Sequence, residues 1–343
     1  MKRNDFIKST VGLIAASTVL SSFNNRPDAG QKDRTKIIPK GLLKGDIIAL
    51  TAPAGSIWNR NHIEKMQTLL AEMGFKTRLG KTLYEQDGYL AGNDELRAAE
   101  LMGFYEDKSI KAILTMRGGW GCARILDLLD YEIIRKNTKI IIGFSDITSL
   151  VNAIYTRSKV ITFHGPCGYS SWGDFTQEQV TNALVLGKSF LMKNPSHHKS
   201  ELKTWVSGKA KGELIGGNLT VILSLIGTAY EPNWYGKILC LEEIGEEPYR
   251  VDRMLWQMKQ AGIFNKITGL IIGSFKNCEA EEPHKSFSLE EVFTQHFSDF
   301  RTPVYQGAAF GHIGPKFTLP IGVLAEMDAD AFTIKTLEMS VLG

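Results

Sequence analysis

The chain has 343 residues, 43% of them hydrophobic and 22% charged, which is enough for one large or two medium domains with ample core. The 40 basic and 37 acidic residues leave a net charge of only +3, and no basic stripe stands out, which argues against a nucleic-acid partner or an acidic membrane surface. The four cysteines form no C-x-x-C pair and no Cys/His spacing typical of zinc, so we interpret them as reduced core residues.

The first residues have the pattern of an export signal. Lys2, Arg3 and Lys8 supply positive charge before an apolar run over 11–20, which is too short for a stable membrane-spanning helix. The basic segment is similar to a twin-arginine signal that lacks its second arginine. We therefore expect residues 1–36 to be an export signal and linker on a periplasmic protein without stable membrane insertion after signal removal. An uncleaved tail on a cytoplasmic protein is the alternative.

Strand and helix patterns alternate through the first half of the chain. Apolar runs predict strands at 46–50, 75–79, 111–116, 140–142 and 160–163, and helical spacing predicts helices at 63–73, 93–105, 123–129 and 147–155. The strand runs are almost unbroken by polar residues, which is typical of a parallel sheet covered on both faces. We therefore expect residues 37–165 to form a Rossmann-like α/β domain.

The second half has a different organisation. Residues 166–206 are polar and lose the alternation, so they are predicted to be a linker with a short helix. A glycine-rich stretch then precedes a helix, and short strands dominate after residue 318, so residues 207–343 are predicted to form an α+β domain with a smaller, curled sheet. The expected elements are strands at 237–241, 267–274 and 304–309 and a helix at 249–262.

Two turns in the first half carry the parts that an acyl-transfer enzyme needs. In 140–148 an apolar run is followed by a turn with Ser145 at its crest, and in 113–121 a similar run ends in a glycine-rich loop. A serine can act as a nucleophile, and glycine amides can bind an oxyanion. Such turns lie side by side at the carboxyl edge of an open parallel sheet. Taken alone, Ser145 is more usually interpreted as a helix N-cap.

Two residues of the second half suit the other roles in such a site. His312 lies in a loop between glycines, where an uncrowded ring can reach a neighbour as a base. Glu242 follows a predicted strand and can hold a histidine ring N–H. The alternatives are a solvated loop histidine and an acidic loop paired with Arg250 and Arg253.

Together, these features resemble the LD-carboxypeptidases, serine peptidases with a Ser-Glu-His triad that include murein tetrapeptide carboxypeptidase and the microcin C self-immunity peptidases. The resemblance extends from about residue 42 to residue 341. Glu243 stands where the family commonly has aspartate, and the export signal is a departure from the best-known members, which act in the cytoplasm. The motifs that carry the resemblance are 51–55, 92–97, 117–121, 143–148, 163–166, 216–219, 241–243, 248–253 and 311–312.

The resemblance implies a role for each site residue. Ser145 would be the nucleophile, His312 the general base and Glu242 the orienting carboxylate, in a cleft between the two domains. The oxyanion hole would be formed by the amide of Asp146 together with that of Gly118 or Gly119. The resemblance implies neither a metal nor a cofactor.

Two further residues are candidates for substrate binding. Arg117 could bind the free carboxylate of a peptide and Trp120 could wall the subsite of the terminal D-residue. The alternatives are a salt bridge to the following helix for Arg117 and simple packing for Trp120.

The function implied is hydrolysis of an L–D peptide bond, which releases the C-terminal D-amino acid of a murein tetrapeptide. The partner is a small peptide substrate, with no nucleic acid, and a homodimer is left open. Three alternatives are a self-immunity-type peptidase that cleaves a peptide–nucleotide conjugate, a non-catalytic exported protein that binds wall peptides, and a nucleotide-binding protein using 117–121 as a phosphate loop. That loop lacks the lysine and Ser/Thr of a P-loop.

Overall fold

The computed structural model of the protein describes residues 34–196 and 202–343. Nearly all of the predicted export signal therefore lies outside the described residues. Within the described part of the chain, no helix combines the length and the apolar composition needed to cross a membrane.

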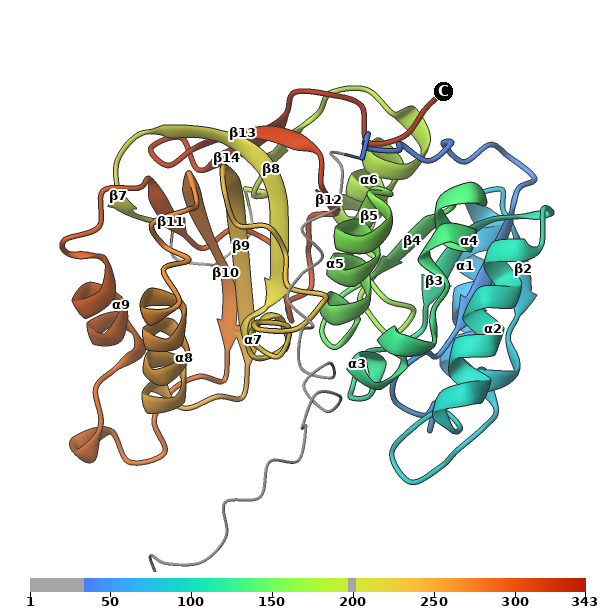
Figure 1. Ribbon diagram of the computed structural model, residues 1–343, viewed down its shortest axis with the longest axis horizontal. Coiled ribbons are helices and arrows are strands. Elements are labelled where there is room, and N and C mark those ends of the chain that lie inside the picture. The colour runs from blue at the N-terminus through green and yellow to red at the C-terminus, as the bar shows by residue number, and fades with distance from the viewer. Residues whose placement is uncertain (1–33, 197–201) are drawn as a thin grey trace, which may run out of the picture. The chain divides into compact units, whose positions relative to one another are not determined.

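Across the described residues, six strands form a first sheet in the order β12-β5-β4-β3-β1-β2 (Figure 1). The five strands from the first half pair in parallel, as the unbroken apolar runs predicted. Because they are parallel, the loops that follow β1, β3, β4 and β5 all leave the same edge of the sheet. The strands are β1 (Ile47–Thr51), β2 (Lys76–Leu79), β3 (Ile110–Thr115), β4 (Ile140–Gly143), β5 (Thr162–His164) and β12 (Leu319–Ile321).

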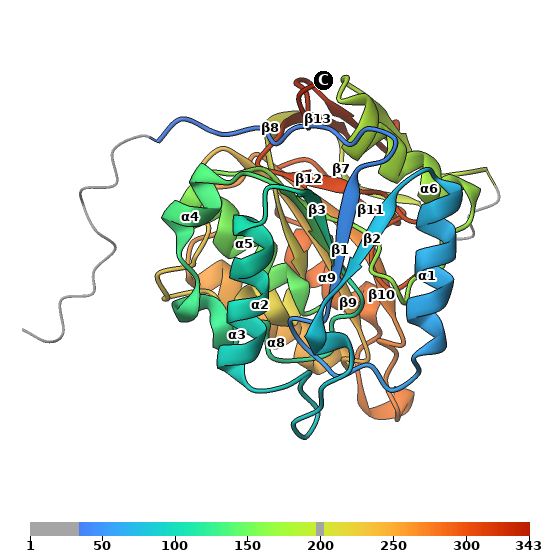
Figure 2. The same cartoon turned by 90° about the vertical axis from the view of Figure 1, so that its right-hand side faces the viewer.

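Helices cover both faces of this sheet, with α1 on one side and α2, α4 and α5 on the other (Figure 2). Helix α1 buries Ile63, Met66 and Leu70, which share one face at helical spacing. Helix α2 begins close to the predicted start at 93, and the side chain of Asn93 caps it by accepting the Leu96 amide. The helices are α1 (Asn61–Glu72), α2 (Asp94–Glu106), α3 (Cys122–Ile125), α4 (Tyr131–Lys136), α5 (Ile147–Ser158) and α6 (Asp174–Thr181).

A second sheet of eight strands, counted over the described residues, has the order β6-β14-β13-β8-β9-β10-β11-β7. Its centre, from β8 to β11, is parallel, and antiparallel strands extend it on both sides. Its strands are β6 (Leu191–Lys193), β7 (Lys203–Val206), β8 (Lys209–Asn218), β9 (Lys237–Ile244), β10 (Gly269–Lys276), β11 (Val304–Gln306), β13 (Leu324–Asp328) and β14 (Thr333–Thr336), and its helices are α7 (Leu219–Leu223), α8 (Pro248–Gln260) and α9 (Leu289–Phe297).

The fold class is confirmed, and several details differ from the prediction. The second sheet has more strands than the first within the described residues, so it is not the smaller one. Residues 166–206, expected to be a linker with a short helix, contain α6 and also the edge strands β6 and β7. These strands have three and four residues and no continuous buried run. They therefore form because they pair with the sheet, and their own hydrophobic pattern does not predict them.

Three local elements also differ. Strand β12 comes from the second half of the chain but pairs antiparallel with β5, which completes the edge of the first sheet. The helix expected over 123–129 is split into α3 and a 3-10 turn at Leu126–Leu128. Helix α9 was not predicted, although Ser288 and Glu291 form a capping box at its start.

The two sheets are joined by buried polar contacts from helix α5. The Asn152 side chain donates to the carbonyl of Gly216 over 2.8 Å and accepts the Gly216 amide over 3.2 Å. Nearby, the Thr148 hydroxyl accepts the amide of Asn218. Strand β8 is thus fixed against α5 by hydrogen bonds in addition to packing.

We expect Asn152→Ala to lower the free energy of unfolding by about 2–4 kcal/mol, because it leaves both buried polar groups of Gly216 without partners. Chemical denaturation would measure the change. The exposed Gln257→Ala on α8 is the control and should be close to neutral. Equal effects of the two substitutions would show that the α5–β8 bonds contribute no net stability.

Candidate active site

Ser145 occupies a strained turn between β4 and α5. Its φ is +65°, in the left-handed region that residues with a Cβ rarely adopt. Strand β4 ends at Gly143 and α5 begins at Ile147, so the turn is tight. The half-buried hydroxyl is therefore presented at the carboxyl edge of the first sheet, beside the positive end of α5.

The structure brings His312 and Glu242 together with Ser145. His312 Nε2 lies 3.2 Å from Ser145 Oγ, and His312 Nδ1 lies 2.7 Å from Glu242 Oε2. The Glu242 side chain is fully buried in β9, whereas the His312 side chain is 17% exposed. The three groups thus come from a turn of the first sheet, a strand of the second sheet and the loop that follows β11.

The backbone beside Glu242 approaches its carboxylate closely. A Cβ on Gly311, whose φ is +104°, would lie 2.7 Å from Glu242 Oε2, so the backbone there has no room for a side chain. Glu242 Oε1 has no hydrogen-bond partner among the described residues. The neighbouring His164 is buried between Phe144 and Phe310, and burial lowers its pKa to about 4, so it is neutral at neutral pH.

Gly118 lies directly against the Ser145 turn. A Cβ at this position would be 2.8 Å from Ser145 Cβ and 2.9 Å from the Asp146 amide nitrogen, so only glycine fits. Gly119, with a φ of +99°, continues the loop at an exposed position. The glycine loop and the Asp146 amide therefore lie side by side at the serine, as the sequence predicted for the two turns.

Asp146 connects the glycine loop to the serine turn through its side chain. Its buried carboxylate accepts the amide of Cys122, the first residue of α3, over 2.8 Å. Burial raises the pKa of Asp146, while the Cys122 amide acts in the opposite direction. The start of α3 is thus tied to the residue after the candidate nucleophile.

Arg97 was not singled out as a site residue, although it closes one of the family motifs. It is fully buried, and its guanidinium donates to the carbonyls of Pro53, Gly92 and Gly121 and pairs with Asp94. It therefore fixes three loops at the carboxyl edge of the sheet, including the glycine loop.

The two candidate substrate-binding residues have different surroundings. Arg117 donates to the carbonyl of Ser56 over 2.9 Å, and its guanidinium lies 5.8 Å from the ring centroid of Trp58. Trp120 is 54% exposed and meets Tyr89 edge to face. Of the two, only Trp120 lines the cavity next to Ser145. Arg117 does not line it, although a Cβ on Gly119, which does, would lie 3.3 Å from Arg117 Nη2.

This cavity has a volume of about 280 Å³ and lies between elements of the two sheets. One wall is the glycine loop with α3, and the other is α7 with the end of β9. Its lining consists of Gly119, Trp120, Gly121, Ala123, Arg124, Ser145, Asp146, Asn218, Thr220, Val221, Ser224, Glu243, Ile244 and Glu246.

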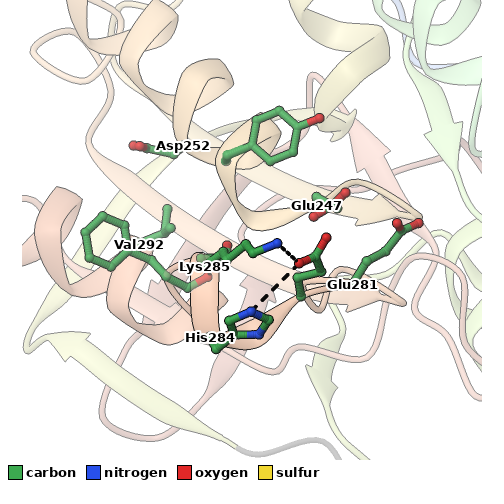
Figure 3. Close-up of a pocket in the computed structure, with 10 residues that line it drawn as sticks. Glu247, Asp252, Glu281, His284, Lys285 and Val292 are labelled. Atoms are coloured by element: carbon green, nitrogen blue, oxygen red, sulfur yellow. Dashed lines mark hydrogen bonds and ion pairs between the residues drawn. The ribbon is translucent and has the colours of Figure 1, made fainter.

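A larger cavity of about 690 Å³ lies elsewhere, beside the loop that precedes α9 (Figure 3). It is lined by Glu247, Asp252 and Glu281, and within it Glu282 pairs with Lys285. None of the three candidate catalytic residues lines it. The larger cavity therefore contains none of the hydrogen-bonded groups that make the Ser145 turn the candidate active site. No group of three or more metal-ligating side chains occurs among the described residues.

Lys316 was also missed by the sequence analysis. Only 3% of it is exposed, and its Nζ lies 4.0 Å from the ring centroid of Phe144, the residue before Ser145. Among the described residues, the one hydrogen bond of Lys316 Nζ is a long one, 3.4 Å to Ser170 Oγ. Burial lowers the pKa of Lys316 to about 8, against the attraction of Cys167 and Glu242.

We expect Lys316→Met to stabilise the fold at pH 7. Because the pKa of Lys316 falls from 10.5 to about 8 on folding, the unfolded chain binds more protons between these values, and wild-type stability rises with pH across this window. The cost of the buried charge is fully present below pH 8 and amounts to about 3 kcal/mol at most.

The gain in Tm should therefore be largest below pH 8 and fade toward pH 10.5. Thermal unfolding at a series of pH values would measure it, with the exposed Lys111→Met as the control. A gain that does not change with pH would mean that improved packing, not the buried charge, is responsible.

Comparisons with known proteins identify the family of the chain. The model of the LD-carboxypeptidase N-terminal domain matches residues 48–165, and that of the C-terminal domain matches residues 211–327. The chain is 38% identical over 293 residues to the probable murein peptide carboxypeptidase of Bacillus subtilis, covering 84% of this chain and 91% of that protein.

Two solved structures are similar over most of their length. One is the wild-type apo form of the microcin C7 self-immunity protein MccF, known from Escherichia coli, with a TM-score of 0.83 and 27% identity over 89% of this chain and all of that one. The other is muramoyltetrapeptide carboxypeptidase from Oxalobacter formigenes, with a TM-score of 0.72 and 28% identity over 84% of this chain and 97% of that one.

Proposed function

The chain belongs to the LD-carboxypeptidase family, and we propose that it hydrolyses the L–D peptide bond of a murein tetrapeptide with a triad of Ser145, His312 and Glu242. The product is the free C-terminal D-amino acid. The names of the relatives from Bacillus subtilis and Oxalobacter formigenes support the murein substrate.

The observation that carries the proposed triad is the chain of contacts through the His312 ring. With the ring proton on Nδ1, His312 donates to Glu242 Oε2 over 2.7 Å, and Nε2 is left to accept the Ser145 hydroxyl over 3.2 Å. This is the arrangement that a nucleophile, a base and an orienting carboxylate require.

In the first half of the reaction, Ser145 Oγ attacks the carbonyl carbon of the L-residue while its proton passes to His312 Nε2. Glu242 stabilises the resulting imidazolium, and its burial keeps water from weakening that interaction. His312 then protonates the amine of the departing D-amino acid, the C–N bond breaks, and an acyl-enzyme remains.

In the second half, water replaces the amine. His312 takes a proton from the water, whose oxygen attacks the acyl carbon, and the proton returns to Ser145 Oγ as the ester bond breaks. Both tetrahedral intermediates carry an oxyanion, for which the amide of Asp146 and that of Gly118 or Gly119 are the proposed donors. The close contact between Gly118 and the Ser145 turn supports this assignment.

A second candidate is cleavage of a peptide–nucleotide conjugate by the same triad. The structural similarity to MccF, with a TM-score of 0.83, is the observation that favours this second candidate. Measuring kcat/KM for an aminoacyl-sulfamoyl nucleoside and for a tetrapeptide discriminates between the two functions, because the preferred substrate will have the higher value.

We expect Ser145→Ala to lower turnover of a murein tetrapeptide by about 10³-fold or more while leaving the fold intact, because the nucleophile is lost and no core contact is removed. Mass spectrometry of the peptide would follow the release of D-alanine. Ser298→Ala, at an exposed position, is the control and should keep full activity. Near-normal turnover and stability in the Ser145 variant would show that this serine is not the nucleophile and acts only as a helix cap.

We expect Glu242→Gln to be less damaging than His312→Ala. The amide can still hold the ring, but it does not stabilise the imidazolium and can favour the other tautomer. Steady-state kinetics in the presence of EDTA would measure both, and chelation should leave the wild-type rate unchanged. Full activity of the glutamine variant, or zinc-dependent recovery after chelation, would contradict the triad mechanism.

A further inference from the structure

His164 is a buried histidine beside the candidate triad, and the proposed reaction does not use it. It ends β5, where it is in register with Gly143, the last residue of β4. Only 1% of His164 is exposed, and neither Nδ1 nor Nε2 has a hydrogen-bond partner among the described residues. Because burying a polar group without a partner is costly, two unpaired ring nitrogens indicate a bound group that the described protein atoms do not supply.

The ring of His164 lies between the segments that carry Ser145 and His312. The Phe144 ring on the serine turn and the Phe310 ring on the loop of the base each meet it edge to face, with 6.2 Å between the centroids. The Phe144 ring in turn lies 4.9 Å from the His312 ring. These aromatic contacts place His164 next to the nucleophile and the base.

The same ring also lies beside the strands that hold Glu242. A Cβ on Gly217 of β8 would be 2.7 Å from His164 Cδ2, and the next residue, Asn218, is in register with Glu242 on β9. Burial has the largest effect on the pKa of His164 and lowers it, and the Glu242 carboxylate is the largest charge that opposes this effect. The ring and the carboxylate are therefore neighbours in the core.

Two buried oxygens in this region also have no hydrogen-bond partner among the described residues. One is Glu242 Oε1, since His312 contacts only Oε2. The other is the hydroxyl of Thr318, and a Cβ on Gly165, the residue after His164, would lie 3.1 Å from it. Both side chains are fully buried. Two ring nitrogens and two oxygens, all unpaired within the described structure, thus lie in one part of the core.

We propose that a buried water links the His164 ring to Glu242 Oε1, with the Thr318 hydroxyl as its third partner, and that His164 is thereby a positioning residue for the orienting carboxylate. This inference rests on the proposed function. A neutral imidazole has one N–H donor and one acceptor nitrogen, and a buried water makes about three hydrogen bonds to such groups. The ring fixes the water, and the water donates to Oε1. With both oxygens held, the carboxylate is prevented from rotating away from His312 Nδ1.

A high-resolution crystal structure of the wild-type protein tests for the water directly and does not depend on activity. We expect density for a water within hydrogen-bond distance of both a His164 nitrogen and Glu242 Oε1. The absence of such density, or a protein group bonded to Oε1 in its place, would overturn the proposal.

Kinetics test whether the link matters for the triad. His164→Phe removes both ring nitrogens and keeps an aromatic ring. Because the substrate is not contacted, kcat for a murein tetrapeptide should fall by about 10- to 100-fold, the range for one hydrogen bond to a charged group, while KM stays within about twofold. His164→Gln retains a donor and an acceptor and should recover part of the loss.

The matched control is His296→Phe, which replaces another buried histidine. The ion pair of His296 in the described structure is with Asp252 of α8 and involves none of the triad residues. Its kcat should equal that of the wild type, measured at a temperature where thermal unfolding shows every variant to be folded.

A double-mutant cycle separates positioning of the carboxylate from a general structural effect. If His164 acts through Glu242, adding His164→Phe to Glu242→Ala should lower kcat by less than about twofold, because the group to be positioned is already absent. Multiplication of the two separate losses in the double variant would contradict the proposal. If the His164→Phe variant does not fold, the crystal structure of the wild type decides.

The outcomes distinguish this inference from the proposed function. An active wild type together with an unchanged kcat in His164→Phe would overturn the inference and leave the carboxypeptidase activity standing. A wild type that releases no D-alanine would remove the proposed function and the positioning role with it.

Discussion

The space between Gly118 and the Ser145 turn is the constraint on which the site depends. The glycine loop approaches so closely that a single methyl group would collide with both Ser145 and the Asp146 amide. That approach puts amide donors and a hydroxyl within one small volume, while the left-handed φ of Ser145 turns the hydroxyl outward. The strained serine turn and the glycine loop therefore form one structural unit, because the hydroxyl and the amide donors lie close together only when both adopt this conformation.

Buried polar groups help to hold that unit in place. Arg97 joins three loops from within the protein, and Asp146 ties the start of α3 to the serine turn. Directional bonds of this kind limit the positions that a loop at a sheet edge can adopt. Burying such groups is costly unless each is satisfied, and Arg97 is satisfied through several carbonyls at once. Buried hydrogen bonds thus contribute to the rigidity of the site.

Much of the fold and of the site could be predicted from local patterns. The apolar runs of β1, β3 and β4 and the cap at Asn93 are readable because each depends on neighbours in sequence. The proximity of the Ser145 turn to the glycine loop followed from the geometry of parallel sheets. The edge strands β6, β7 and β12 could not be predicted, because only pairing with a distant strand makes them strands. The surroundings of Arg117 could not be predicted either, because adjacency to the glycine loop is visible in sequence, whereas the direction of a guanidinium is not.

The candidate triad is divided between the two sheets, and this makes their junction part of the chemistry. Ser145 belongs to the first sheet, whereas Glu242 and His312 belong to segments of the second. Their geometry is thus determined by how β8 sits on α5, through Asn152 and through the contact between Thr148 and Asn218. Asn218 also donates to the carboxylate of Glu243, which follows Glu242 in β9, so two hydrogen bonds connect α5 to the strand that carries Glu242. Because a shift of about 1 Å between nucleophile and base is enough to slow catalysis strongly, a polar junction of fixed length suits this division better than apolar packing, which tolerates sliding.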